Sequence, residues 1–372
     1  MRPAVLGGAR RLAAGLAALA CLLVLPVAGQ AQALPDALYD SFNLDIVRGQ
    51  VIPGYRAFAA ETARLDEAAA AYCAAPDDAA HAALIARYHD AYDAWEGVQW
   101  LGFGPAKDFM RIMRIQFWPD SRNTLTRHIA TLMADPRTDL LDPAVLADAS
   151  VALQGFPALE RLLFDDAPPG EDAYACALAA AIAANLAQMA ADLAAVWDPV
   201  PDDPDASARA AIDALGYPEP AALTGDLYQA LYFHLEAILT VKLARPMGET
   251  LEDARATRGE SWRSGRSMRN IRRNLSAIRG LLDNGDALGF ADIVAETAGR
   301  PDLAEALRAA LDEAIAAADA LAGPFTETLA DPALRGDFVR LATALNTARE
   351  YVAVGVGEAL GLAVGFNSLD GD

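Results

Sequence analysis

Apolar residues recur along most of this chain at three- and four-residue spacing, which is the period of an amphipathic α-helix. One such set is Leu84, Tyr88, Tyr92 and Trp95, and another is Met268, Ile271, Leu275, Ile278 and Leu282. No run of alternating β-branched residues, which would favour strands, competes with this pattern. The pattern predicts helices at 39–73, 78–103, 121–133, 143–164, 171–197, 224–244, 266–282, 301–321 and 332–364.

A proline- and aspartate-rich tract at 198–205 is the strongest interruption, because no helix can cross it. It divides the chain after residue 33 into 34–200 and 201–372, each long enough for a four-helix bundle. A weak echo of 156–163 in 233–239 favours duplication. We therefore predict an all-α fold of two duplicated four-helix-bundle-like domains packed against each other.

The N-terminus has the features of a cleaved signal peptide over residues 1–33. Arg10 and Arg11 precede an apolar run at 12–27, and Ala31-Gln32-Ala33 matches an A-x-A cleavage site. The run is short for a membrane span, so we expect no transmembrane helix in the mature chain. The predicted location is therefore the periplasm or cell envelope.

The net charge of −21 would fall to about −24 after loss of the three arginines in 1–33. So acidic a protein is not expected to bind nucleic acid or an anionic membrane surface. Only Cys73 and Cys176 would remain in the mature chain. They are predicted either to form one disulfide or to stay as two separate buried thiols.

Two polar clusters are candidates for a binding site. Trp118, Arg122 and Asn123 lie in a predicted loop, where exposed aromatic and polar groups often serve sites. Arg266, Arg269 and Arg273 lie on one helical stripe, and guanidinium groups fit carboxylates or phosphates. The stripe could equally form a structural ion-pair network, and we favour that interpretation.

The metal-binding residue types form no complete motif. His81, His89, His128 and His234 are scattered, and His234 beside Tyr232 and Phe233 is expected to be a packed core residue. No His-Glu-x-x-His motif, cysteine cluster, phosphate loop or nucleophile elbow occurs. The sequence therefore identifies no resident cofactor, although iron or another divalent metal could bind.

The segment Gly155-Phe156-Pro157-Ala158-Leu159-Glu160 resembles the Gly-x-His-x-x-Glu motif of the imelysin family. These are bacterial envelope proteins first described as metallopeptidases. Pro157 stands where the motif has histidine, and proline can neither bind a metal nor carry a proton. Further family-like stretches follow in the expected order at 94–96, 102–105, 117–123, 260–267 and 365–372.

The resemblance implies two related helical bundles, an envelope location and a link to iron or haem acquisition. It also implies a site where the two bundles meet, around Glu160. If a metal binds there, Glu160 is the one expected ligand. On this basis the expected cleft residues are Trp118, Arg122, Asn123, Glu160, Arg266, Arg269 and Asn367.

Three functions follow, in order of preference. The first is a non-catalytic protein that binds an iron-linked ligand or an envelope transport component in this cleft. The second is a metallopeptidase that uses Glu160 with His234 or His128, and the third is an interaction scaffold without a small-molecule site.

We also predict a helix break near Gly155, because Pro157 inside a long helix would cost about 3 kcal/mol.

Overall fold

The computed structural model describes residues 35–165, 169–197, 200 and 208–362, and these contain helices and no strand. The all-α prediction is therefore confirmed for the described chain. The signal peptide and Asn367 lie outside the described residues. The duplication and the domain boundary at residue 200 stay predictions.

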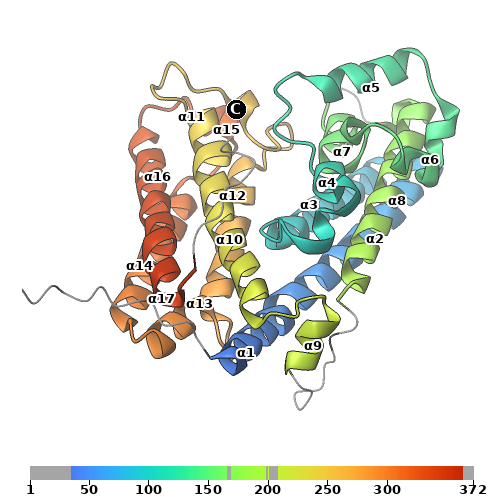
Figure 1. The fold of residues 1–372 in the computed structure, drawn as a ribbon. Coiled ribbons are helices and arrows are strands. Elements are labelled where there is room, and N and C mark those ends of the chain that lie inside the picture. Colours follow the sequence, from blue (N-terminus) through green and yellow to red (C-terminus); the bar gives the residue numbers. More distant parts are fainter. Residues whose placement is uncertain (1–34, 166–168, 198–199, 201–207, 363–372) are drawn as a thin grey trace, which may run out of the picture.

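Helices of the first part of the chain pack around α8 and form what we call the N-terminal bundle (Figure 1). Its main contacts join α8 to α2, α6 and α7, and α2 to α3. The helices are α2 (Ile52–Ala74), α3 (Asp78–Val98), α4 (Arg111–Ile115), α5 (Thr124–Ala134), α6 (Pro143–Ala147), α7 (Gly155–Leu163) and α8 (Ala173–Ala195).

The remaining helices form the C-terminal bundle, in which α14 packs on α12 and α16 and α10 packs on α16. They are α9 (Ala208–Ala214), α10 (Pro220–Ala237), α11 (Arg245–Met247), α12 (Ser267–Asp283), α13 (Phe290–Asp292), α14 (Pro301–Ala320), α15 (Phe325–Thr328), α16 (Arg335–Glu350) and α17 (Gly357–Leu360). The spacing predicted for α12 is confirmed, since its five apolar positions are all buried.

The first helix connects the two bundles. Helix α1 (Asp36–Ile46) continues through a π-helical turn, Val47–Val51, into α2. Its own contacts are with α9 and α10, whereas α2 contacts α3 and α8. Figure 1 shows this helix, in blue, running from the C-terminal bundle to the N-terminal bundle. The first helix therefore packs with the part of the chain that follows residue 200.

The predicted long helix at 143–164 is wrong. The chain there forms α6, a 3-10 turn (Val151–Leu153) and then α7. The predicted break near Gly155 is confirmed, because α7 begins at that residue. The helix predicted at 224–244 is present, but its end, Ile238–Ala244, is π-helical.

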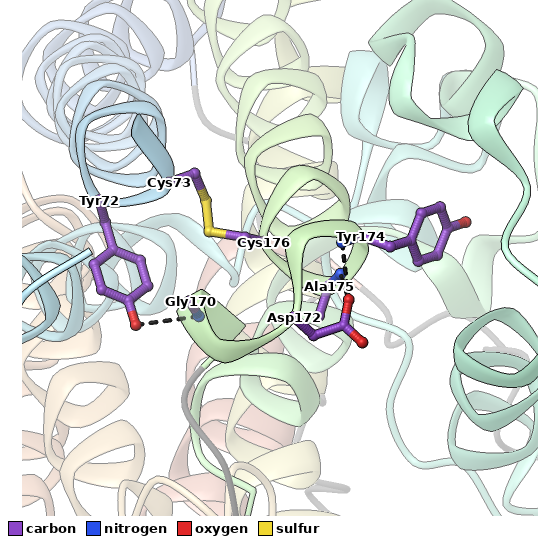
Figure 2. Close-up of a disulfide and its surroundings, with 7 residues drawn as sticks. All are labelled: Tyr72, Cys73, Gly170, Asp172, Tyr174, Ala175 and Cys176. Carbon is purple, nitrogen blue, oxygen red and sulfur yellow. Dashed lines mark hydrogen bonds between the residues drawn. A yellow bond between two sulfur atoms is a disulfide. The ribbon is translucent and has the colours of Figure 1, made fainter. Parts of the chain in front are cut away.

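Cys73 and Cys176 form a disulfide, with 5.6 Å between their Cα atoms. It joins the end of α2 to the first turn of α8 (Figure 2). Beside it, the Tyr72 hydroxyl accepts a hydrogen bond from the Gly170 amide at 3.2 Å. Of the two sequence alternatives, the disulfide is therefore the one observed.

Helix α8 is the one helix of the described chain that is long and apolar enough to cross a membrane. Of its most apolar window, 61% is buried inside the protein. Its alanine- and leucine-rich surface faces α2 and α7 rather than solvent. Packing in the bundle core therefore accounts for its composition.

Candidate functional site

Gly155 and Pro157 together set the position of Glu160. Gly155 has φ +68°, a left-handed conformation that suits glycine, and a Cβ there would lie 2.1 Å from the Ile115 carbonyl oxygen. Pro157 is the third residue of α7, where its missing N–H would in any case have no partner within the helix. Glu160 follows one turn later on the buried face of this short helix.

Glu160 is almost fully buried, and one residue of the C-terminal bundle holds it. Its Oε1 accepts hydrogen bonds from the Ser264 amide at 2.9 Å and the Ser264 hydroxyl at 2.6 Å. Burial raises the pKa of the Glu160 carboxyl, and the Ser264 hydrogen bonds oppose part of that rise. The contact joins α7 to a loop more than one hundred residues away in sequence.

Glu160 lines a cavity of about 430 Å³ between the two bundles, which we call the Glu160 cavity. The N-terminal bundle contributes Trp118, Asn123, Pro157 and neighbouring residues of the loop before α5. The C-terminal bundle contributes Arg245, Thr257, Arg258, Gly259, Ser261, Trp262 and Arg263. The predicted cleft residues Trp118, Asn123 and Glu160 are therefore brought together.

The stripe of arginines on α12 and just before it binds α3 and lies outside the Glu160 cavity. Arg266, Arg269 and Arg273 all bind Asp93 of α3, at 2.5, 2.6 and 2.7 Å. Burial would raise the pKa of the Asp93 carboxyl, but the Arg269 and Arg266 guanidinium groups lower it overall. These arginines do not line the Glu160 cavity. They form a structural network, as favoured from the sequence, but with Asp93 and not with Glu160 or Asp120.

Arg266 is only 1% exposed, and its contacts explain why so large a cation can be buried. Its guanidinium donates to the His89 carbonyl at 3.1 Å and lies over the Tyr92 ring, 4.8 Å from the centroid. The other predicted arginine, Arg122, is exposed and does not line the cavity. The arginines that line it are Arg258 and Arg263, in the loop before α12, and Arg245 of α11.

A buried ion cluster lies between the bundles. Lys242 binds Glu96 of α3 and Glu260, both at 2.7 Å, and Asn274 at 2.8 Å. Burial lowers the pKa of the Lys242 ammonium, but Glu260 and Glu96 raise it overall. Burial, with repulsion from Glu260, raises the pKa of the Glu96 carboxyl to about 7. Glu96, Glu260 and Asn274 thus hold one buried lysine charge.

A second cavity, of about 680 Å³, adjoins this cluster. We call it the aromatic cavity, because its walls include Trp95, Trp100, Phe103, Trp118 and Phe233. Trp118 also lines the Glu160 cavity, as does Gln116, so the two cavities share one wall. The peptide bond between Trp118 and Pro119 in this wall is cis.

His234 lines the aromatic cavity, not the cavity of Glu160. Burial, with the nearby Lys242 charge, lowers the pKa of its imidazole to about 3, so the ring is neutral at pH 7. Its Nε2 has no hydrogen-bond partner among the described residues, and the same holds for Trp95 Nε1 and Gln116 Oε1. The prediction that His234 is a buried residue is confirmed.

Sequence reasoning missed Lys242, Glu96, Asp93, Ser264 and Arg245. Charged residues are too common in this acidic chain to single these out by type. The family-like stretches were the available signal, since 94–96 carries Glu96 and 260–267 carries Glu260, Arg263 and Ser264. The lysine and its two acids are 146 and 18 residues apart and share no local motif.

Comparison with known proteins establishes the family. The family model described as imelysin matches residues 51–352, which is most of the chain. The chain belongs to the imelysin family. This imelysin-family chain is 27% identical over 290 residues to iron-regulated protein A of Synechococcus elongatus, covering 75% of this chain and 74% of that protein.

Two solved structures share the fold of this family member. An imelysin-like protein from Psychrobacter arcticum has a TM-score of 0.73 at 20% identity, covering 90% of this chain and 99% of that one. A protein proposed to be an iron-regulated protein A precursor, from Parabacteroides distasonis, has a TM-score of 0.65 at 17% identity. That match covers 86% of this chain and 96% of the other.

The Glu160 cavity does not fit the divalent metal that a metallopeptidase would need. Its lining contains no histidine, and Pro157 occupies the motif position. Across the described residues, no group of three His, Cys, Asp or Glu side chains is arranged to hold a metal ion. The two carboxylates of the lining, Asp120 and Glu160, already accept hydrogen bonds from Leu125 and Ser264, and alone they are a poor ligand set for such an ion.

Proposed function

We propose that this imelysin-family protein is an exported envelope protein of iron handling that binds an iron-linked ligand in the Glu160 cavity, without peptidase chemistry. The observation that carries the proposal is Glu160 itself, a buried carboxylate lining a cavity between two bundles. Burying a carboxylate is costly unless hydrogen bonds or a paired cation compensate for the lost hydration. Here Ser264 supplies the hydrogen bonds, and both come to one oxygen.

The relatives support the iron-linked part of the proposal. One is named iron-regulated protein A, and one solved structure is described as a precursor of such a protein. The word precursor and the signal-like residues 1–33 support export to the envelope. A transport component of the envelope remains an alternative occupant of the same cleft.

The peptidase alternative has less support. It needs His234 or His128 beside Glu160, but neither lines the cavity, and His234 faces the other one. The scaffold alternative treats Glu160 and its neighbours as structural contacts alone. It predicts that substitutions there lower stability and change nothing else.

The test is native mass spectrometry of protein purified from periplasm, with metal analysis of the same sample. We expect a retained iron-linked ligand in the wild type and its loss from Glu160→Ala and Trp118→Ala, by about tenfold or more in affinity, because each removes a wall contact. Glu305→Ala, an exposed acid on α14, is the control and should retain the ligand.

Two outcomes would contradict the proposal. The first is a wild-type protein that carries neither iron nor an iron-linked ligand and binds none when titrated. That result would favour the scaffold alternative. A bound divalent ion with chelator-sensitive peptide hydrolysis would favour the metallopeptidase instead.

A further inference from the structure

The Glu160 cavity has a cationic lining in a strongly acidic protein. Arg245, Arg258 and Arg263 line it, against two carboxylates, Asp120 and Glu160. The whole chain has 51 acidic and 30 basic residues, so this local excess of positive charge runs against the composition. The excess is a property of the cavity and not of the surface as a whole.

Two of the three arginines have no carboxylate partner. Among the described residues, no Asp or Glu lies within ion-pair distance of Arg245 or Arg258, and neither makes a side-chain hydrogen bond there. Arg245 is half-buried and Arg258 is exposed. Arg263 differs, since it binds Asp165 at 3.2 Å and lies over the Trp262 ring at 4.5 Å.

Other arginines of the same segment are paired. Arg266, Arg269 and Arg273 bind Asp93, and Arg279 binds Asp283 and Asp312. Acidic partners are therefore available to this segment, whereas Arg245 and Arg258 line the cavity without one among the described residues.

The two carboxylates of the cavity form no ion pair with Arg245 or Arg258, and their oxygens accept hydrogen bonds from other groups. Asp120 Oδ2 accepts from the Leu125 amide at 2.8 Å and caps α5. Glu160 Oε1 accepts twice from Ser264. The cationic donors of the cavity that lack a carboxylate partner among the described residues are thus the Arg245 and Arg258 guanidinium groups, with hydroxyls from Ser121, Thr126 and Thr257 nearby.

We propose that the Glu160 cavity binds a small anion bearing carboxylate or phosphate groups, held by Arg245 and Arg258. Guanidinium forks donate paired hydrogen bonds to the oxygens of both groups. A cavity of about 430 Å³ is the size of a small-molecule site. The proposal rests on the proposed function and names the chemical class of its ligand.

The geometry also explains why the histidine position can be proline here. A ligand that presents negative oxygens needs donors, and Pro157 contributes only shape to the wall. The cations come instead from α11 and from the loop before α12, on the other bundle. An anion would therefore be held mainly by the C-terminal bundle.

The experiment is isothermal titration calorimetry of the full mature chain with citrate and with inorganic phosphate at low ionic strength. We expect at least one to bind, and Arg245→Ala/Arg258→Ala to weaken that binding about tenfold or more, because charge-assisted hydrogen bonds are lost. Arg87→Ala, an exposed arginine of α3 outside the cavity, should bind as the wild type does. Tighter binding of citrate indicates a carboxylate ligand, and tighter binding of phosphate a phosphate ligand.

Absence of binding by both anions, or equal binding by the double variant, would overturn the proposal. Thermal unfolding checks that the variants fold, and Arg258→Ala alone serves if the double variant does not, because Arg258 is exposed. The two proposals fail separately. If an iron-linked ligand binds and depends on Glu160 but not on these arginines, only the anion proposal is contradicted. If an anion binds without any link to iron, the proposed function is contradicted.

Discussion

Single residues decide the shape of the motif region. Gly155 can adopt φ +68°, and it lies so close to a neighbouring backbone that an added Cβ would be only 2.1 Å from the Ile115 carbonyl oxygen. Pro157 needs the chain to start a new helix just before it, and it does. The expectation of a break here came from proline chemistry alone, and the structure confirms it.

Replacing Gly155 by alanine should destabilise the protein by more than about 2 kcal/mol. A left-handed conformation costs a non-glycine residue about 1–2 kcal/mol, and the Cβ would also collide with the Ile115 carbonyl. Urea unfolding measures the change. Gly225→Ala is the matched control, since that helical glycine has no atom within 4 Å of the added Cβ and should gain about 0.5–1 kcal/mol. Equal effects at both positions would contradict the argument.

At the scale of helices, the periodic spacing of apolar residues predicted some ranges well and others poorly. Helices α3, α8, α12 and α14 lie close to their predicted ranges, because their apolar spacing is local information. The prediction of one continuous helix at 143–164 was wrong, because short helices joined by tight turns can show the same apolar spacing. The π-helical turn that carries Lys242 has no sequence signature of its own.

The disulfide belongs to this scale, because it joins the ends of α2 and α8. Replacing Cys73 and Cys176 by serine should lower the free energy of unfolding by about 2–5 kcal/mol, as expected when a loop of about 100 residues is released in the unfolded chain. Urea unfolding with and without reductant measures it. Reductant should not affect the double variant; if it does, another thiol–disulfide step is involved.

At the scale of the whole molecule, buried ion pairs join the two bundles. Lys242 of the C-terminal bundle binds Glu96 of α3, and the arginine stripe of α12 binds Asp93 of the same helix. Both carboxylates stand one turn apart on α3. The orientation of the bundles, and with it the two cavities, therefore depends on α3 meeting α12.

Lys242→Met should destabilise the protein by about 3–5 kcal/mol, because it leaves Glu96 and Glu260 buried without their cation. Lys107→Met is the control and should change stability by less than about 0.5 kcal/mol, since Lys107 is exposed. Chemical denaturation measures both. A small effect at Lys242 would mean that the carboxylates are protonated or hydrated in the folded protein.

The loss of folding stability in Lys242→Met should also be smaller at pH 5 than at pH 8. The pKa of Glu96 is about 7 in the folded protein against 4.5 as its ordinary value, so between these values the folded state binds more protons than the unfolded state. Folding stability from this group therefore rises as pH falls through that window. It should rise more in the variant, because Lys242 lowers the pKa of Glu96 and its removal raises that pKa further. A variant whose loss is independent of pH would contradict this account.

The sequence by itself determined the helices, most of their limits, the break at Gly155 and the family. Each of these depends on residues within one or two helical turns, or on short ordered motifs. Tertiary structure alone decided which carboxylate each arginine binds, that Lys242 lies between two acids, and which side chains line the Glu160 cavity. The contacts between the bundles, such as Lys242 with Glu96 and Arg266 with Asp93, join residues more than one hundred positions apart, and an acidic chain offers each cation many partners. Only the packing of the two bundles selects among them.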